Sequence, residues 1–256
     1  MNAAILPVAN QKGGVGKTTT ALSLAAAFSL TGKRVLVLDL DPHISASVHL
    51  QFYPEHLVNT VHDLFLGAEE NWPAIWSAIR CSQGLRFDFV PGHIRLSELD
   101  MDLQHRPGKG DILANALRLV QSEYDYIILD CPPNVGVVLV NALVAASMVV
   151  IPIQTDFLAL NGLRLLFDTM RTLNRVLPRS LDYRVLATMY DRRVGACRKV
   201  MELLRRKMGE RMFETVIQVD TKFRDACALG KVIYDIAPES RGAKEYLSLA
   251  KEIEAR

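Results

Sequence analysis

The chain has 256 residues, half of them apolar and 23% charged, and a net charge of +2. This balance is ordinary for a globular protein and excludes a polycation, so any affinity for nucleic acid must come from a local patch. Four cysteines without regular spacing indicate free thiols in a reducing compartment and argue against a disulfide scaffold or a zinc site. The N-terminus lacks the basic residues of a signal peptide, and we expect a cytoplasmic protein.

Strand-like apolar runs alternate with helical patterns along the chain. The predicted strands are 5–9, 34–40, 85–90, 126–129, 148–153, 183–189 and 213–217. The predicted helices are 17–30, 111–123, 135–146, 158–176, 194–208 and 240–254. Continuous Val, Ile and Leu strands joined by helical crossovers predict an α/β fold with a doubly wound, mainly parallel sheet covered by helices on both faces. No linker or repeat interrupts the pattern, so we expect residues 1–256 to form a single domain.

Two features of the predicted strands need an explanation. Residues 132–155 carry no charge and could span a bilayer by length. Polar residues interrupt this segment and β-branched residues gather in its second half, which favours a buried helix followed by a buried strand.

Pro7 is unusual in the first strand, because proline cannot donate to a ladder and belongs at edges or bulges. We expect a local irregularity there.

The segment between the first predicted strand and helix, A-N-Q-K-G-G-V-G-K-T-T-T, has the features of a phosphate-binding loop. Gly13, Gly14 and Gly16 let backbone amides wrap a phosphate closely, and the helix adds its positive N-terminal end. Lys17 supplies a charge for the β- and γ-phosphates, and Thr18 a hydroxyl for Mg²⁺. The alternative is a plain glycine turn. The placement between a strand and a helix disfavours it.

Carboxylates follow two other predicted strands. Asp39 and Asp41 come after the second strand and Asp130 after the fourth, and ligands of parallel sheets bind beyond such strand ends. Beside a phosphate loop, Asp130 is placed to hold Mg²⁺ through water, although an Asp after a strand is often only a cap. The loop itself departs from the usual motif: Gln11 replaces a glycine, and Lys12 is an additional lysine.

The loop K-G-G-V-G-K-T-T resembles the deviant Walker A loop of the ParA/MinD family of P-loop ATPases. V-L-V-L-D-L-D-P-H is similar to the family's D-x-D-P segment, and Y-D-Y-I-I-L-D-C-P-P-N-V-G to its Walker B region. V-I-P-I-Q-T-D-F-L-A-L-N-G-L resembles a further family segment, and the closing G-K-V-I-Y-D-I-A-P-E-S-R-G-A-K-E-Y-L-S-L-A-K-E-I is similar to the end of ParA (Soj-like) members. The likeness covers nearly the whole chain and is weakest over 53–84.

The resemblance implies an ATPase whose two subunits enclose two ATP molecules. Lys12 would stabilise charge on the partner's nucleotide, Lys17 would bind phosphates and Asp41 would position the attacking water, so these three are the expected catalytic residues. A solvated loop lysine is the alternative for Lys12. The expected Mg²⁺ ligands are Thr18, Asp39 and Asp130. The expected nucleotide-binding residues are Lys12, Gly13, Gly14, Val15, Gly16, Lys17, Thr18, Thr19, Gln218 and Asp220.

The chain also departs from the family pattern at three places. His43 replaces the usual Gln after the D-x-D-P proline, and we expect it to alter the switch segment more than catalysis. Asp156 replaces a usual Glu. The sequence I-Q-V-D replaces the common I-P-R-N near the adenine, which puts the contacts of Gln218 and Asp220 in doubt.

A basic segment suggests DNA as a partner. Residues 192–211 contain eight basic and two acidic residues. On a helix their apolar residues form one stripe and basic side chains lie opposite, which suits non-specific phosphate contacts. The alternative is an ordinary solvated face. The resemblance to ParA (Soj-like) members also implies that Arg193 and a second basic region, which follows residue 220, contact DNA. The expected DNA-binding residues are Arg193, Arg198, Lys199, Arg205, Arg206, Lys222 and Arg224.

The resemblance therefore implies a cargo-positioning ATPase. ATP would drive homodimerisation, the dimer would bind nucleoid DNA, and a ParB-like or other adaptor on the cargo would stimulate hydrolysis. One alternative is a membrane-surface regulator of the MinD or flagellar-number type, but the closing helix lacks the basic amphipathic character of a membrane helix. Another is an ATPase of the nitrogenase iron-protein type, which needs paired cluster cysteines; only Cys131 lies beside the expected site.

Overall fold

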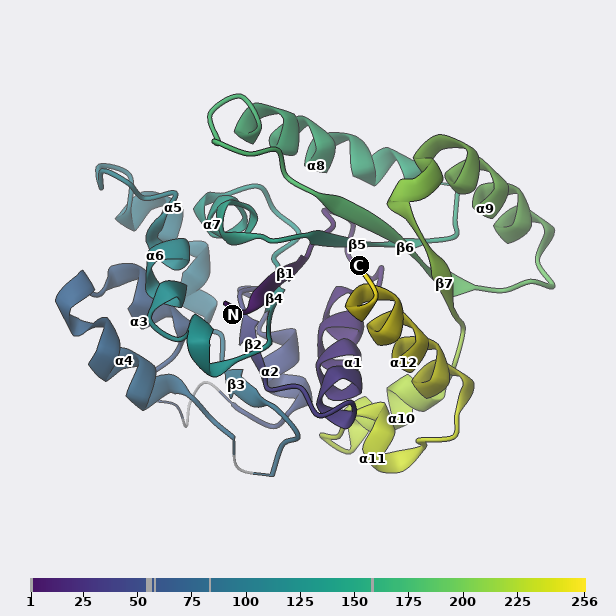
Figure 1. Ribbon diagram of the computed structural model, residues 1–256, viewed down its shortest axis with the longest axis horizontal. Coiled ribbons are helices and arrows are strands. Elements are labelled where there is room, and N and C mark those ends of the chain that lie inside the picture. The colour runs from purple at the N-terminus through teal and green to yellow at the C-terminus, as the bar shows by residue number, and fades with distance from the viewer. Residues whose placement is uncertain (1, 54–56, 58, 83, 158) are drawn as a thin grey trace.

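A parallel β-sheet forms the centre of the computed structural model, which describes residues 2–53, 57, 59–82, 84–157 and 159–256. Within that part of the chain the sheet has seven strands in the order β3-β2-β4-β1-β5-β6-β7 (Figure 1). They are β1 (Ala4–Val8), β2 (Val35–Asp39), β3 (Asp88–Val90), β4 (Tyr126–Asp130), β5 (Val149–Gln154), β6 (Tyr183–Tyr190) and β7 (Met212–Gln218). Every pairing between these strands is parallel, so the predicted sheet is confirmed.

Helices cover both faces of the sheet. One face is covered by α1 (Lys17–Leu30), α2 (Ser45–His49), α10 (Lys222–Ala228), α11 (Ile233–Ile236) and α12 (Arg241–Glu254). The other is covered by α3 (Val61–Leu66), α4 (Trp72–Ile79), α5 (Leu99–Asp102), α6 (Ile112–Arg118), α7 (Val137–Ala145), α8 (Ala159–Leu173) and α9 (Gly195–Met208). Short 3-10 turns occupy Glu69–Asn71, Ile94–Ser97, Gln121–Glu123 and Gly209–Arg211. The doubly wound α/β prediction is confirmed.

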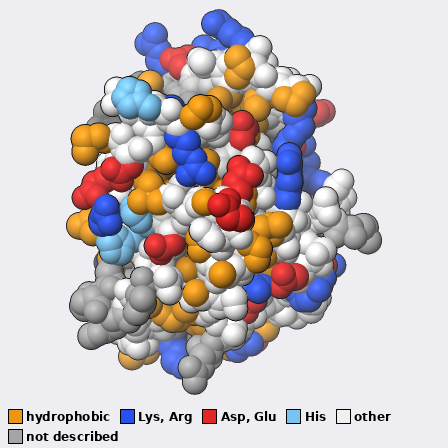
Figure 2. All heavy atoms as spheres, turned by 90° about the vertical axis from the view of Figure 1, so that its left-hand side faces the viewer, with side chains coloured by type: hydrophobic (Ala, Val, Ile, Leu, Met, Phe, Trp, Pro, Cys, Tyr) orange, Lys and Arg blue, Asp and Glu red, His pale blue; other side chains and the backbone are white. Residues whose placement is uncertain are grey.

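The surface on the side of α3 to α6 carries charges of both signs. Figure 2 shows this face, where acidic, basic and apolar side chains are interspersed. The basic helix α9 lies on the opposite side of the molecule in Figure 1.

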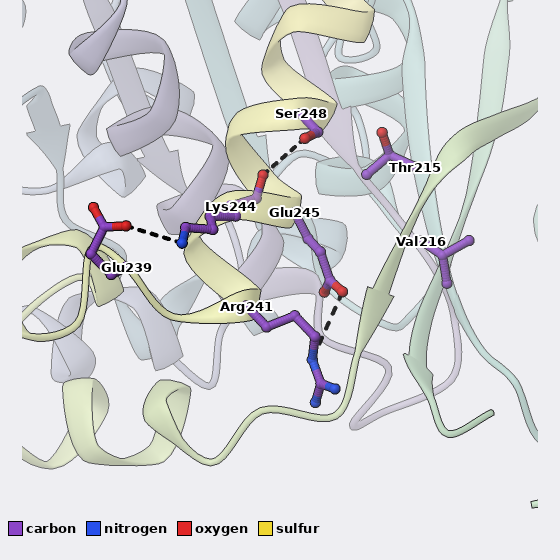
Figure 3. A pocket seen from close by; sticks show the side chains of 7 residues that line it. All are labelled: Thr215, Val216, Glu239, Arg241, Lys244, Glu245 and Ser248. Atoms are coloured by element: carbon purple, nitrogen blue, oxygen red, sulfur yellow. Dashed lines mark hydrogen bonds and ion pairs between the residues drawn. The ribbon is translucent and has the colours of Figure 1, made fainter. Parts of the chain in front are cut away.

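Strand β7 is one edge of the sheet, and α12 covers its open hydrogen-bonding groups. The Glu252 carboxylate accepts from the amides of Glu214 (2.9 Å) and Thr215 (3.0 Å), and Glu245 accepts from the amide of Gln218 (2.8 Å). A groove of about 500 Å³ remains between these contacts, with Glu245 pointing across it (Figure 3). Two carboxylates of one helix thus protect an edge that would otherwise be free to pair with another strand.

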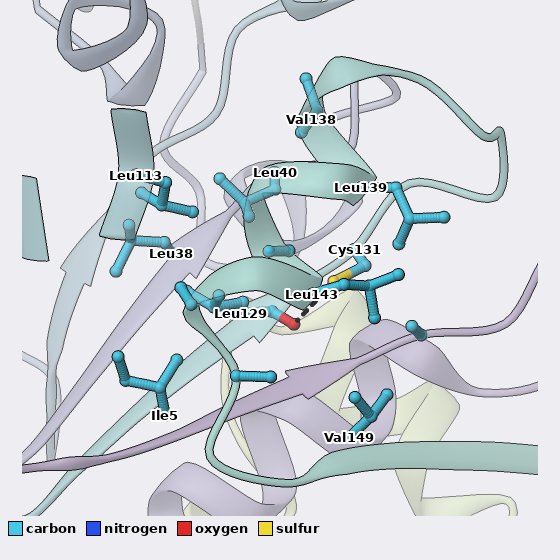
Figure 4. Packing of buried hydrophobic residues seen from close by; sticks show 14 of the residues in the cluster. Ile5, Leu38, Leu40, Leu113, Leu129, Cys131, Val138, Leu139, Leu143 and Val149 are labelled. Atoms are coloured by element: carbon cyan, nitrogen blue, oxygen red, sulfur yellow. Dashed lines mark hydrogen bonds between the residues drawn. The ribbon is translucent and has the colours of Figure 1, made fainter. Parts of the chain in front are cut away.

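Successive residues of each strand enter two separate apolar clusters. In β2, Leu36 and Leu38 pack on one face while Val35 and Val37 pack on the other, as the alternation of side chains along a strand requires. Figure 4 shows the first cluster, where α7 and α6 close over the ends of β2 and β4 around the buried Cys131. This packing fixes the strand ends that carry the acidic residues.

Pro7 lies in the middle of the sheet and not at an edge, and the expected local irregularity is a gap in the pairing of β1 with β5. The amides of Ile5 and Ala9 both face β5, where they donate to Ser147 Oγ and the Val150 carbonyl at 3.0 Å. Position 7 has the same parity, so its missing N–H also faces β5. Strands β1 and β5 are paired at a single register position, and the proline therefore falls where the ladder is already open.

The element boundaries differ from the sequence predictions at several points. Helix α6 ends at Arg118, five positions before the predicted end at 123. Strand β3 has three residues where six were predicted. The predicted start of α8 at Leu158 lies outside the described residues. The short helices between β2 and β3, and α10 and α11, were not predicted.

The uncharged segment 132–155 forms α7 and β5, both within the core. Among the described residues, no helix combines the length and apolar character that crossing a membrane requires.

Candidate nucleotide-binding site

The loop between β1 and α1 is shaped for close contact with an anion. Gly14 and Gly16 have φ of 74° and 90°, in the left-handed region that favours glycine. A Cβ atom at Gly13 or Gly14 would meet no heavy atom within 4 Å, so the loop borders open space. Gly16 directly precedes α1, and no side chain caps this helix. The first amides of α1 are therefore free to bind a phosphate.

Hydrogen bonds from neighbouring strands hold this loop in place. Asn10 Nδ2 donates to the Pro152 carbonyl at 2.7 Å, and Asn10 Oδ1 accepts from the Lys12 amide at 3.0 Å. The Thr188 hydroxyl donates to the Val15 carbonyl at 2.9 Å. Neither Asn10 nor Thr188 was predicted from the sequence, because Pro152 and Val15, the partners that tie them to the rest of the fold, are distant in sequence.

Lys17, Thr18 and Thr19 form the first turn of α1 and line the same cleft as the glycines. The Lys17 side chain is buried, and its Nζ donates a long hydrogen bond of 3.5 Å to the Lys12 carbonyl. The ammonium group is thus folded back over the loop, where the phosphates of a nucleotide would lie. Its position agrees with the phosphate-binding role expected for it.

The structure brings Asp39 and Asp130 together beside the loop. The two residues are register partners at the ends of β2 and β4, and Asp130 also pairs with Val8 at the end of β1. Both carboxylates are fully buried. Three neighbouring parallel strands therefore deliver the glycine loop and two carboxylates to one point.

Asp130 is buried without a hydrogen bond of normal geometry to either carboxylate oxygen. Burial and the charge of Asp39 raise the pKa of Asp130 well above its ordinary value, while the Thr18 hydroxyl and the Lys17 ammonium oppose the shift. A buried and unpaired carboxylate is costly. A cation at this point would stabilise it.

Asp39 is held by a network that the sequence did not reveal. The hydroxyl and the amide of Ser47 donate to Asp39 Oδ2 at 2.7 and 2.8 Å, and Ser47 Oγ accepts from the Gly92 amide at 2.9 Å. A Cβ atom at position 92 would lie 2.8 Å from the Asp39 carbonyl oxygen, so only glycine fits. Burial raises the pKa of Asp39 to about 6 in spite of the Ser47 hydrogen bonds.

Asp41 lies just beyond β2 and is also buried. Its Oδ1 accepts from the backbone amide of His43 at 3.0 Å and lies 2.8 Å from His43 Nδ1. The imidazole is largely exposed, and both residues line the cleft. His43, which occupies the position of the family's Gln, is therefore in direct contact with Asp41, the expected catalytic carboxylate.

Lys12 does not point into its own phosphate loop. Its Nζ forms an ion pair of 3.1 Å with Asp156 Oδ2, just beyond the end of β5, and 28% of its side chain is exposed. The ion pair directs this additional lysine toward Asp156, which is itself one of the departures from the family pattern. This placement suits a lysine that acts outside its own chain.

The cleft beside the loop has a volume of about 840 Å³, enough for a nucleotide. Gln218 and Asp220 line it, but both side chains have partners within the protein. Gln218 Nε2 donates to Glu245 Oε1 at 2.8 Å, and the Asp220 carboxylate accepts from the amides of Lys222 and Gly242, each at 2.9 Å. Their adenine contacts remain a prediction. Met189, Phe223 and Tyr246 add apolar surface to the same cleft.

The residues beside the phosphate loop fit Mg²⁺, which would be held partly by nucleotide phosphates, better than a metal ion held by protein side chains alone. In the described part of the chain, no group of three or more His, Cys, Asp or Glu side chains could hold a metal ion. Magnesium is usually held by one or two carboxylates, water and substrate phosphates. Asp39, Asp130 and the Thr18 hydroxyl beside an open phosphate loop match that set.

The basic residues leave the sheet at the same end as the phosphate loop. Tyr190 and Gln218 are register partners at the ends of β6 and β7, so the segments that carry Arg193 and Lys222 start side by side. Arg193 is exposed and ion-paired with Asp191 at 2.8 Å, and this contact lowers the pKa of Asp191 to about 2.

The other basic residues are distributed along two helices. Arg198, Lys199, Arg205 and Arg206 are exposed on α9, while Val200, Met201 and Leu204 are buried, as the predicted stripe requires. Arg205 lies about 10 Å further along the helix axis than Arg198. Lys222 pairs with Asp225 at 2.9 Å, and Arg224 lines the nucleotide cleft.

A glycine loop that runs from the first strand of a parallel sheet into a helix, beside buried carboxylates on neighbouring strands, defines the P-loop NTPases. A family model described as an AAA domain matches residues 3–183. The chain is 36% identical to the sporulation initiation inhibitor protein Soj of Bacillus subtilis, with 98% of each chain covered. It is 35% identical to the chromosome partitioning protein ParA of Caulobacter vibrioides, over 98% of this chain and 94% of that protein. The chain belongs to the ParA/Soj-like branch of the ParA/MinD ATPase family.

Solved structures share this architecture. A cobyrinic acid a,c-diamide synthase from Mycobacterium smegmatis with a bound ATP analogue and magnesium gives a TM-score of 0.79 at 30% identity, covering 97% of this chain and 93% of that one. An ATP complex of Cyanothece McdA gives a TM-score of 0.85 at 19% identity, covering 99% and 97%. At that level of identity the second likeness concerns the fold alone.

Proposed function

We propose that this chain is an ATP-driven switch that positions a cargo. It binds ATP with Mg²⁺, dimerises, binds nucleoid DNA without reading its sequence, and is released when a cargo-bound adaptor of the ParB type stimulates hydrolysis. The observation that carries the nucleotide part is Asp130, whose buried carboxylate oxygens have no hydrogen bond of normal geometry within the described part of the chain and lie beside an open phosphate loop. Such a site is completed by a phosphate-bound cation.

Each residue of the site has a role in this proposal. The loop amides and Lys17 hold the β- and γ-phosphates. Asp39, Asp130 and the Thr18 hydroxyl would hold Mg²⁺, which would neutralise phosphate charge when bound. Asp41 holds the attacking water in line with the γ-phosphate. Its burial at the mouth of the cleft keeps the carboxylate in a fixed orientation.

The placement of Lys12 supports the proposed dimerisation. In the single chain its ammonium pairs with Asp156 across a partly exposed contact. Exposed pairs are worth about 0–1 kcal/mol, so the exchange of Asp156 for the triphosphate of a partner subunit costs little. The likeness to Soj and ParA, together with this outward position, supports a dimer that encloses its nucleotides.

DNA binding rests on the two basic segments that leave the sheet together. Arg193 is 85% exposed and, among the described residues, its side chain is held by Asp191, and phosphate can replace this carboxylate at small cost. Arg198 and Lys199 follow on the first turns of α9. Exposed cationic side chains suit contacts with the phosphate backbone, so we expect binding that depends on salt rather than on sequence.

The membrane alternative finds no support in the closing helix. The apolar face of α12 is buried in the core cluster through Ala243, Tyr246, Leu249, Ala250 and Ile253. The face that a membrane-binding helix would insert is therefore already packed. The names of the relatives, which refer to sporulation and chromosome partitioning, favour a partition complex as the cargo.

ATP turnover and light scattering with ATP test the nucleotide part of the proposal. Lys17→Ala should weaken ATP binding by about 10-fold to 100-fold, because it removes a charged phosphate contact. Lys12→Ala should leave ATP binding intact but reduce dimerisation or turnover. Lys33→Ala, an exposed lysine beyond α1, is the matched control. Tight ATP binding by Lys17→Ala would remove the phosphate-loop assignment, and an unchanged Lys12→Ala would remove the role across the dimer.

A further inference from the structure

The contact between His43 and Asp41 gives one carboxylate oxygen two donors. Asp41 Oδ1 accepts from the His43 backbone amide at 3.0 Å and lies 2.8 Å from the ring Nδ1 of the same residue. A carboxylate oxygen only accepts, so Nδ1 carries the proton in this contact. Two donors at one oxygen fix the rotation of the carboxylate about its Cβ–Cγ bond.

The other oxygen of Asp41 remains available. Among the residues that the structure describes, no hydrogen bond reaches Asp41 Oδ2. Asp41 is buried, yet it lines the nucleotide cleft together with the histidine. Fixing Oδ1 therefore determines where Oδ2 points, and a carboxylate that positions a water needs such a fixed oxygen.

We propose that His43 is a positioning residue for ATP hydrolysis, which holds Asp41 through Nδ1 so that Asp41 Oδ2 can orient the attacking water. This inference rests on the proposed ATPase function. It revises the expectation that His43 alters the switch segment more than catalysis, because the ring contacts the catalytic carboxylate directly. The exposed Nε2 atom of the His43 ring has no role in this positioning.

Substitution of His43 by residues with amide side chains can distinguish the roles of the two ring nitrogens. The amide nitrogen of Asn lies near the position of Nδ1, whereas that of Gln reaches toward Nε2. His43→Asn should therefore keep the donor to Asp41, and His43→Ala should lose it. His105→Asn, at an exposed histidine between α5 and α6, is the matched control for a change of His to Asn.

The measurement is Mg²⁺-dependent phosphate release at saturating ATP, together with the affinity for a fluorescent ATP analogue. His43→Ala should lower kcat by about tenfold to 100-fold, the effect of one hydrogen bond to a charged acceptor, with ATP affinity changed less than twofold (~0.4 kcal/mol). His43→Asn should recover most of this loss. In an Asp41→Asn background, His43→Ala should have no further effect, because the histidine acts through the carboxylate.

The outcomes separate the inference from the function on which it rests. A wild type with no turnover above that of Lys17→Ala would remove the proposed function itself. Normal wild-type turnover with an unchanged kcat in His43→Ala would overturn the positioning role and leave the function intact. A loss in His43→Asn as large as that in His43→Ala would also overturn it, since the ring would then act through Nε2.

Discussion

Gly92 shows how a residue without functional groups shapes the acidic site. Its amide donates to Ser47 Oγ, and the same hydroxyl donates to Asp39. A methyl group at this position would lie 2.8 Å from the Asp39 carbonyl oxygen and 3.1 Å from its Cγ. The glycine therefore permits the close approach that orients Asp39.

Gly92→Ala should disturb Asp39 and Ser47 together. Because backbone atoms must move, we expect a loss of about 1–3 kcal/mol in the free energy of unfolding and weaker Mg²⁺-dependent ATP binding. Urea unfolding and nucleotide titration measure the two effects. Gly110→Ala is the control, since a Cβ atom there would lie at an ordinary 3.7 Å from Val140. Equal behaviour of the two variants would contradict the steric role of Gly92.

The residues of the site differ in how far the sequence could predict them. The glycine loop, Lys17 and Asp130 belong to local patterns with a direct physical meaning, and the structure brings them together. Ser47, Gly92 and Asn10 act through partners that lie elsewhere in the sequence, and no local pattern identifies them. Their roles depend on the register of neighbouring strands.

The pairing of α12 with the edge of β7 is the clearest contribution of one element to stability. Burial opposes ionisation of Glu252, but hydrogen bonds from Thr215 and Glu214 outweigh it and lower the pKa of Glu252. A carboxyl group with a lowered pKa in the folded state stabilises the fold above its ordinary pKa of 4.5. That contribution is lost as the pH falls through the lower folded value.

Glu252→Gln should reduce the free energy of unfolding at pH 7 by about 1–3 kcal/mol, because it replaces charged acceptors of two amides. The difference from the wild type should shrink below pH 4. Urea unfolding at several pH values measures it. Glu239→Gln, at a carboxylate that is 87% exposed, should change the stability by less than about 1 kcal/mol. A difference independent of pH would contradict the role of the charge.

Long elements were predictable and short ones were not. The strands are continuous apolar runs, and α9 keeps an amphipathic helical pattern over four turns. The helices α2, α3 and α5 have five, six and four residues, too few to show a period. Pro7 was expected to mark a local irregularity, but the form of that irregularity, a gap between β1 and β5, is a property of the assembled sheet that no local rule predicts.

Across the molecule, the sheet places three groups of candidate functional residues at one end. The phosphate loop follows β1, the acidic residues follow β2 and β4, and the basic segments follow β6 and β7. Arg224 belongs to the basic set and also lines the nucleotide cleft. Nucleotide and DNA are therefore expected to be read by adjoining surfaces, which gives a physical basis for DNA binding that depends on ATP.

Binding to double-stranded DNA of random sequence, with ATP, ADP or no nucleotide and at two salt concentrations, tests this account most directly. We expect binding only with ATP and weaker binding at higher salt. Asp41→Ala should strengthen it by trapping the ATP state, and Arg193→Ala should weaken it and reduce the salt slope by about 1. Asp191→Asn should strengthen it by freeing Arg193 from its ion pair. Binding that is equal in all nucleotide states, or absent from all of them, would contradict an ATP-dependent switch that binds DNA.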